Sequence, residues 1–406
     1  MRRTRGLLAA LGVLALLLAG WVAVRAAAPP PRPTVVLISM DGVRWDYPEK
    51  DHLRAFAAMA KEGARAARLI PPFPSLTFAS HSTLATGCQP GRHGIIANSF
   101  LDPETGRRFT DSDEAGWLLA PPLWVLAEEA GLRAAVSGWP LSKGPWHGVQ
   151  ASFYRPFEGG SSDAETAAWI LALLRRPEAQ RPHLIMAWTH GADGAGHAQG
   201  PDGPAVREAM RRADALLAQL RAGIRALGPA VPVDLVLVSD HGMAAVSRVI
   251  DVVKAIPKRG FYPYIATSGP VCNVYVKTEA QRRQVAAGLS RLPGDVRIYT
   301  RSTLPSRWEY AESGREGDFI LVAPPGAYFS SFNRKGEKSL PRGMHGWPPS
   351  EVSQMDGIFY AEGPGIPAGK LLGDVHATDV APTVCALLGI APPPRAEGSA
   401  LFLPNR

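Results

Sequence analysis

Cysteine is scarce in this sequence, and no cysteine pair has the spacing of a metal or redox motif. The three cysteines, Cys88, Cys272 and Cys385, allow at most one disulfide. A scaffold held together by disulfides and a site built from thiolate ligands are therefore excluded, and we expect structural roles for all three. The sequence also lacks internal repeats and low-complexity tracts, which excludes repeat proteins and makes disorder a poor interpretation.

Neither positive nor negative residues are concentrated in any part of the folded chain. Charged residues make up 20% of the 406 residues, and the net charge of +8 comes in part from the first residues, with the rest scattered. No nucleic-acid-binding module is present, so these charges indicate solvated surface and no nucleic-acid partner. Hydrophobic residues make up 46% of the chain, which is enough for a sizeable core but leaves the number of domains open.

The N-terminus has the pattern of an export signal. Arg2, Arg3 and Arg5 precede an apolar run over residues 6–24, which ends in small residues. Basic residues before an apolar run keep the N-terminus in the cytoplasm and direct the rest of the chain across the membrane. The run approaches the ~20 residues that span a bilayer, so residues 1–30 are predicted to be a signal peptide or an N-terminal membrane anchor. The remainder is expected to be periplasmic, secreted or anchored to the outer face of the inner membrane.

Short β-branched apolar runs alternate with longer amphipathic stretches after the Pro-rich linker that ends at Pro33. The predicted strands are 34–40, 183–188 and 233–239, with weaker candidates at 132–137, 271–276 and 357–361. The predicted helices are 52–65, 164–175, 204–227, 279–291 and 378–388. This alternation predicts an α/β catalytic domain over 34–406, whose central, largely parallel sheet is covered by helices on both faces. A Pro- and Gly-rich stretch, 242–344, predicts a smaller inserted subdomain.

Three predicted strands run directly into glycine-flanked acidic or imidazole side chains. Residues 34–40 are followed by Asp41, the strand at 183–188 leads to Asp193, and 233–239 leads to Asp240. In open α/β sheets, ligands bind outside the carboxyl ends of the strands, so we expect these segments to converge on one site although they are far apart in the sequence.

Spacing within these segments predicts two groups of metal ligands. Asp193 and His197 are four residues apart and share one face of a helical turn, and His345 is a candidate third ligand for the same ion. Asp240 and His241 are adjacent, so they ligate one ion together only if the strand has already ended. Asp41 would complete that second set.

The residue types of this set are carboxylate and imidazole, with no thiolate. Such ligands suit zinc, manganese or iron better than calcium. Singly, each residue has an ordinary structural interpretation as a turn former, a helix cap or a satisfied polar group. Their joint position after apolar strands favours a site for two divalent metal ions, with zinc the preferred ion.

A helix predicted at TFASHSTLAT places Thr77 in its first turn, after the start signals Pro74 and Ser75. Free amides and the positive end of the helix dipole favour an approaching anion at this position. A threonine hydroxyl is a weak nucleophile unless a base or a metal lowers its pKa, so the nucleophile hypothesis depends on the predicted metal pair. The alternative interpretation of Thr77 is a helix cap.

Several motifs together resemble a known family. They are Asp41-Gly42, Thr77-Phe78, HGIIAN ending at Asn98, DGAGHAQGP, SDHGM, GMHGW and FYAEGPG. On these motifs, which cover nearly the whole chain after residue 33, the sequence resembles the nucleotide pyrophosphatase/phosphodiesterases of the alkaline phosphatase superfamily. The resemblance implies an alkaline-phosphatase-like sandwich fold and hydrolysis through a phosphothreonine intermediate.

The same resemblance implies a role for each matching residue. Asn98 would donate a hydrogen bond to a non-bridging phosphoryl oxygen. One ion would be bound by Asp41, Thr77, Asp240 and His241, and the other by Asp193, His197 and His345. The substrate would be a small phosphodiester or nucleotide.

The sequence also departs from the family pattern near the nucleophile. Leu76 stands where the family commonly has Lys, and Ala79 and Ser80 replace the usual Pro-Asn before His81. A sulfatase would need Cys or Ser at position 77, Pro at 79 and Arg at 81, so that alternative is disfavoured. Because the ligand set is complete without them, His81 and His93 are interpreted as structural.

Two alternatives to a phosphodiesterase stay open at this point, a phosphomonoesterase on the same scaffold and a non-catalytic envelope binding protein. A monoesterase of this scaffold adds a cationic pair, such as Lys-x-Arg, at the third phosphoryl oxygen. Here Lys143 is followed by Pro145 at the second position of such a pair, which favours diesters. Trp139, Lys143 and Tyr154 are the predicted substrate-binding residues, and the sequence carries no prediction of oligomeric state.

Overall fold

The strand predicted at 34–40 is present as β1 (Thr34–Met40), and all of its residues are buried. The computed structural model describes residues 32–157, 162–256, 260–330 and 341–402. The predicted leader, residues 1–30, lies outside them. No helix within the described residues is both long and apolar enough to cross a membrane.

An eight-stranded sheet forms the centre of the fold, in the order β18-β2-β17-β8-β1-β7-β5-β6. β1 lies between β7 (Leu184–Thr189) and β8 (Val233–Val238) and is parallel to both. β17 (Phe359–Glu362) is antiparallel to its two neighbours, while the other pairs are parallel. The remaining strands are β2 (Ala64–Ile70), β5 (Ala134–Ser137), β6 (Phe153–Arg155) and β18 (Lys370–His376). The prediction of a largely parallel sheet is confirmed.

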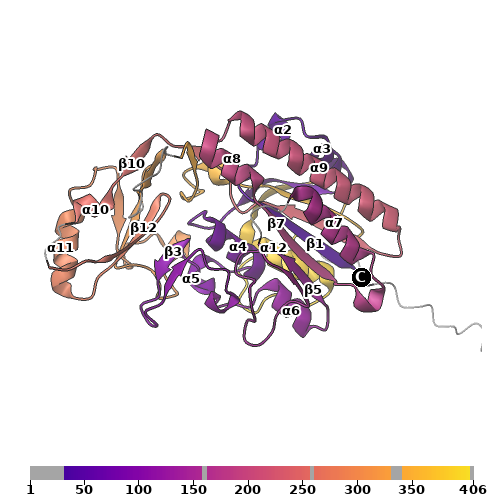
Figure 1. Cartoon of the computed structure of the whole chain (residues 1–406), viewed down its shortest axis with the longest axis horizontal. Helices are drawn as coiled ribbons and strands as arrows, with labels where there is room; N and C mark the ends of the chain where they lie inside the picture. The colour runs from indigo at the N-terminus through magenta and orange to yellow at the C-terminus, as the bar shows by residue number, and fades with distance from the viewer. Residues whose placement is uncertain (1–31, 158–161, 257–259, 331–340, 403–406) are drawn as a thin grey trace, which may run out of the picture. The chain divides into compact units, whose positions relative to one another are not determined.

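Both faces of this sheet are covered by helices, as the sequence predicts (Figure 1). Successive strand residues point to opposite faces, so Val36 and Ile38 pack in one core while Val35 and Leu37 pack in another. The first core includes residues of α3 (Arg54–Glu62), α7 (Asp163–Leu174) and α9 (Pro204–Leu227). The second includes residues of α4 (Thr77–Thr86), α6 (Leu123–Glu129) and α12 (Val380–Leu388).

Predicted and observed ends of the elements differ by at most two residues, except at the end of the helix predicted over 52–65. The helix predicted over 52–65 is wrong at its end, because α3 stops at Glu62 and Ala64 already belongs to β2. β2 and β18 were not predicted as strands. Both carry charged residues and only scattered apolar ones, so neither has the continuous apolar run by which the central strands are found.

A second sheet lies within the stretch predicted as an insertion (Figure 1). It is antiparallel, and its order is β11 (Tyr264–Ser268), β12 (Val271–Tyr275), β14 (Phe319–Val322) and β13 (Arg297–Tyr299). α11 (Glu279–Leu289) contributes Val285 and Leu289 to a core shared with this sheet. The division of 242–344 into a separate subdomain stays a prediction, and residues from Pro33 on cluster as one unit.

Candidate active site

The carboxyl ends of the three central strands bring the predicted ligands together. Asp41 directly follows β1, Asp240 comes two residues after β8, and Asp193 lies on α8 (Gly191–Gln199), which follows β7. The backbone N–H of Gly42 donates to Asp240 Oδ1 at 3.1 Å, and that of Asp193 donates to the Asp41 carbonyl at 3.1 Å. These bonds fix the three loops to one another.

Asp41, Asp240 and His241 form the first acid–histidine group, and all three are buried. One ligand atom from each lies within 4.8 Å of the others. His241 Nε2 is 3.1 Å from Asp240 Oδ2 and 3.4 Å from Asp41 Oδ1. Its Nδ1–H donates to the Gly242 carbonyl at 2.9 Å, so Nε2 is the nitrogen that faces the carboxylates.

Asp193, His197 and His345 form the second acid–histidine group. Asp193 Oδ1 lies 3.2 Å from His197 Nε2 and 3.4 Å from His345 Nε2. Each imidazole again donates its Nδ1–H to a backbone carbonyl, His197 to Gly343 at 2.8 Å and His345 to Ser75 at 3.0 Å. The strand pair β9 (Ala244–Ala245) and β16 (Gly343–Met344) brings the segment before His345 beside the segment after Asp240.

The two groups are in direct contact and adjoin the predicted nucleophile. The rings of His241 and His345 are stacked, with centroids 3.5 Å apart. Thr77 Oγ1 lies 3.3 Å from His241 Nε2. Thr77 is the first residue of α4, whose N-cap residue makes no side-chain hydrogen bond, so the positive end of the helix dipole faces an anion that binds at Thr77.

Burial and crowding of like charges dominate the electrostatics of the site. Burial raises the pKa of Asp41 well above its usual range, and the charges of Asp240 and Asp193 raise it further. Burial also opposes ionisation of Asp240, but the imidazoles of His241 and His81 bring its pKa down to about 2. Asp41 Oδ1, Asp193 Oδ1 and Asp240 Oδ2 are buried without a hydrogen-bond partner. Crowded carboxylates with unmet lone pairs fit a divalent cation at each group.

Asn98 is held next to the nucleophile by its carbonyl oxygen. Its Oδ1 accepts from the backbone N–H of Phe78 at 3.2 Å, across the first turn of α4. The side-chain NH₂ group is then the part of Asn98 that can donate to a ligand.

Two residues at the site were not predicted as part of it. Trp188 donates from Nε1 to Asp41 Oδ2 at 3.1 Å, which orients that carboxylate. His81, which the sequence indicates as structural, is fully buried, and its Nδ1–H donates to the Thr77 carbonyl at 2.8 Å. Trp188 is the next-to-last residue of β7, a strand whose carboxyl end lies at the site. Its position near the end of a predicted strand could have identified it from the sequence.

The predicted substrate-binding residues lie in different environments. Trp139 is 1% exposed, and its ring packs edge-on against His81 at 5.1 Å. Lys143 is at the surface, where its charge acts on Asp113, and Tyr154 is 41% exposed on β6. Their role in binding stays a prediction.

His93 and the three cysteines, which the sequence indicates as structural, are buried in the fold. His93 is fully buried and bonds to Thr83 Oγ1 at 3.0 Å, and burial lowers its pKa to about 3. Cys88, Cys272 and Cys385 are buried free thiols.

The fold assigns the chain to a structural class, and the sequence match assigns it to a family within that class. The sheet, its two helical layers and its catalytic edge define an alkaline-phosphatase-like α/β protein. Residues 35–348 match the type I phosphodiesterase/nucleotide pyrophosphatase family, and the chain belongs to that family. It is therefore one of the hydrolases that act on phosphodiester bonds, which removes the non-catalytic binding protein as an interpretation.

Curated relatives and solved structures agree with this assignment. An uncharacterised pyrophosphatase/phosphodiesterase of Schizosaccharomyces pombe is 30% identical over 369 residues, which are 86% of this chain and 75% of the relative. Mouse bis(5'-adenosyl)-triphosphatase is 28% identical over 89% of this chain and 79% of its own length. Murine ectonucleotide pyrophosphatase/phosphodiesterase 5 has a similar structure, with a TM-score of 0.83 and 26% identity over 90% of this chain and 97% of that one.

Proposed function

We propose that this protein is a two-metal phosphodiesterase or nucleotide pyrophosphatase that acts through a phosphothreonine intermediate on Thr77. The observation that carries the proposal is the Thr77 hydroxyl at the open end of α4, 3.3 Å from an imidazole of the first acid–histidine group. A solved relative supports it: murine ectonucleotide pyrophosphatase/phosphodiesterase 5 with a threonine-to-alanine change is described as inactive and is in complex with AMP.

The two acid–histidine groups would each hold one divalent ion. Asp41, Asp240 and His241 would bind the first with the Thr77 hydroxyl, and Asp193, His197 and His345 would bind the second. We propose zinc for both, since six of these seven ligands are imidazole or carboxylate and none is a thiolate. When bound, such ions lower the pKa of an adjacent hydroxyl or water and neutralise the charge on phosphoryl oxygens.

The protein's own groups provide the nucleophile and hold the substrate. Thr77 Oγ attacks phosphorus in line with the leaving oxygen, whose bond to phosphorus breaks. Water then cleaves the bond between Thr77 and phosphorus and restores the hydroxyl. The NH₂ group of Asn98 and the backbone amide of Thr77 donate to the non-bridging oxygens, and such a donor typically contributes a factor of about 10² to 10³.

Substitution of Thr77 tests the nucleophile. Thr77→Ala should lower kcat by more than about a thousandfold while both ions stay bound, and Thr77→Ser should restore part of the activity. Elemental analysis of both variants controls for metal loss. Turnover by Thr77→Ala above a thousandth of the wild-type rate would remove Thr77 from this role.

The choice between diester and monoester is tested by a ratio of rate constants. We expect kcat/KM for bis-p-nitrophenyl phosphate to exceed that for p-nitrophenyl phosphate at the same pH and metal concentration. A monoester advantage of tenfold, about 1.4 kcal/mol of transition-state stabilisation, would favour the phosphomonoesterase.

We also propose that the enzyme is exported to the periplasm, the medium or the outer face of the inner membrane. Its ectonucleotide relatives and the basic, apolar leader support this location. A reporter that is active only outside the cytoplasm, fused after the C-terminus, should give signal. Mass spectrometry of the mature chain distinguishes a cleaved signal peptide from an anchor. A signal from a second reporter, one that is active only in the cytoplasm, would contradict export.

A further inference from the structure

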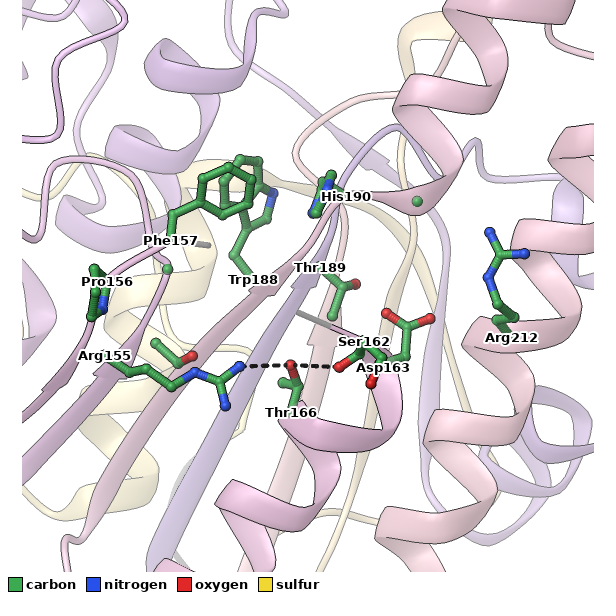
Figure 2. Close-up of a pocket in the computed structure, with 13 residues that line it drawn as sticks. Arg155, Pro156, Phe157, Ser162, Asp163, Thr166, Trp188, Thr189, His190 and Arg212 are labelled. Atoms are coloured by element: carbon green, nitrogen blue, oxygen red, sulfur yellow. Dashed lines mark hydrogen bonds between the residues drawn. The ribbon is translucent and has the colours of Figure 1, made fainter. Parts of the chain in front are cut away.

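A cavity of about 210 Å³ opens at the carboxyl ends of β5, β6 and β7, beside the N-terminal ends of α7 and α8. Figure 2 shows its two kinds of wall. Phe157, Trp188 and His190 form an aromatic side, and the polar side includes Arg155, Asp163, Thr166 and Arg212. None of these residues belongs to the two acid–histidine groups.

Trp188 separates this cavity from the catalytic centre and contacts both. Its indole N–H donates to the predicted metal ligand Asp41 at 3.1 Å. Its ring lies 4.7 Å from that of Phe157, which in turn lies 4.9 Å from the His190 ring. A substituent of a phosphoryl group at Thr77 that extends across Trp188 would therefore reach the cavity.

The charged groups of the cavity favour an anion. Arg155 donates one hydrogen bond from Nη2, to Thr166 Oγ1 at 3.2 Å, and its guanidinium has further N–H groups available. The ion pair of Arg212 with Glu208 is long, at 3.8 Å. The Nη2 atom of Arg212 lies beside Gly191 at the start of α8. One carboxylate, Asp163, lines the cavity with these two cations, and burial raises its pKa although Arg212 opposes the shift. Glu208 and Glu165 act on the two arginines from outside the lining.

We propose that this cavity binds a second anionic group, a phosphate or a carboxylate, on the substituent of the phosphodiester that lies across Trp188. The two guanidinium groups would hold this anion by charge-assisted hydrogen bonds. The inference rests on the proposed function and narrows its substrate class to diesters or pyrophosphates that carry an additional negative charge away from the reacting phosphorus.

Paired synthetic substrates test this inference. Each pair consists of a p-nitrophenyl ω-carboxyalkyl phosphate and the p-nitrophenyl alkyl phosphate of the same chain length, compared over a series of lengths. For the wild-type holoenzyme we expect kcat/KM to be about tenfold higher for the carboxylate at the best length. The advantage should vanish at lengths too short to cross Trp188.

Variants assign this selectivity to the cavity. In Arg155→Gln with Arg212→Gln, the carboxylate-to-alkyl ratio should fall to about one, and Asp163→Asn should raise it, because the competing carboxylate is gone. Arg211→Gln is the matched control, since Arg211 is on the same helix as Arg212, is 66% exposed and pairs with Glu208. It removes one positive charge that does not line the cavity and should leave the ratio at the wild-type value.

The outcomes separate this inference from the proposed function. If the wild type cleaves neither member of any pair, the phosphodiesterase proposal fails. If it cleaves both members equally at every length, or if Arg211→Gln lowers the ratio as much as the double variant, the cavity is not an anion site although the enzyme is a diesterase. Because the ratio is taken within each variant, partial unfolding cannot imitate the expected result.

Discussion

The orientation of three imidazoles is set one residue at a time by the backbone. His197, His241 and His345 each donate the Nδ1 proton to a carbonyl oxygen, of Gly343, Gly242 and Ser75 respectively. Each Nε2 therefore faces a carboxylate, with its lone pair available to a metal ion. This orientation suits all three imidazoles to the role of ligands in the proposed metal sites.

Asn98 provides a prediction at this scale. In Asn98→Asp, the side chain can still accept the hydrogen bond of the Phe78 N–H, but it loses its donor and gains a negative charge near the phosphoryl group. We expect kcat to fall by about 10² to 10³ with an unchanged melting temperature and metal content. A decrease of less than threefold would contradict a direct contact between Asn98 and the substrate.

Asp234 provides a second residue-scale prediction, far from the catalytic chemistry. It is 3% exposed, and burial raises its pKa from 3.8 to about 6, although the Gly365 N–H at 2.8 Å opposes the shift. The folded state therefore binds a proton that the unfolded state releases, so this group makes the protein less stable as pH rises from about 4 to 6. Asp234→Asn keeps the acceptor and should be more stable than wild type at pH 8, by at most ~3 kcal/mol.

Urea unfolding at pH 4 and pH 8 measures this effect. The difference between Asp234→Asn and wild type should be present at pH 8 and close to zero at pH 4. Asp202→Asn is the control of opposite sign, because the hydrogen bond from Lys50 lowers the pKa of the exposed Asp202 carboxylate. Loss of this carboxylate should therefore not stabilise the protein at pH 8. An Asp234→Asn variant less stable than wild type at pH 8 would contradict the sign.

At the scale of elements, the site depends on how closely the start of α8 approaches the end of β1. Gly42 makes this approach possible: its φ is +70°, and a Cβ there would lie 2.8 Å from the Asp193 Cα. The glycine is required both by its left-handed conformation and by the space. It keeps the first turn of α8 beside Asp41.

Gly42→Ala should therefore separate the two acid–histidine groups. We expect loss of metal from the purified protein, a decrease in kcat/KM of at least about a hundredfold and a lower melting temperature. The control is Gly116→Ala, at an exposed glycine with no atom within 4 Å of the added Cβ. Full metal content and activity in Gly42→Ala would show that the approach is not needed.

At the scale of the whole molecule, each acid–histidine group is assembled from distant parts of the chain. The first spans Asp41 to His241, and the second spans Asp193 to His345. An ion bound only by the folded state stabilises it, by ~4 kcal/mol when the free ion is at a thousand times its dissociation constant. Ions bound at both groups would therefore connect the end of the central sheet with the segment that comes after the smaller sheet.

Removal of metal should therefore reduce both activity and stability. Dialysis against a chelator should abolish hydrolysis of bis-p-nitrophenyl phosphate and lower the melting temperature, and zinc should restore both better than calcium. Thr77→Ala serves as the control, because it keeps six of the proposed ligands and should show a similar shift in melting temperature. Full activity and an unchanged melting curve in protein shown to be metal-free would refute the metal proposal.

The central strands, most of the helices and the candidate ligands could be predicted from local patterns in the sequence. Continuous apolar runs such as 34–40 are recognisable because both of their faces are buried, and the polar residues directly after them stand out for the same reason. Strands β2 and β18, at one side of the sheet, could not be found in this way, because they carry charged residues and lack a continuous apolar run.

Which side chains contact one another depends on the packing of the whole chain. The stacking of His241 on His345, the hydrogen bond from Trp188 to Asp41 and the cavity between Arg155 and Arg212 depend on loops that come after different strands. Local patterns report the burial and periodicity of their own segment, whereas the distance between two segments is set by the packing of the elements that lie between them. The residues of the candidate site could therefore be named from the sequence, but the distances between them and the neighbouring cavity could not.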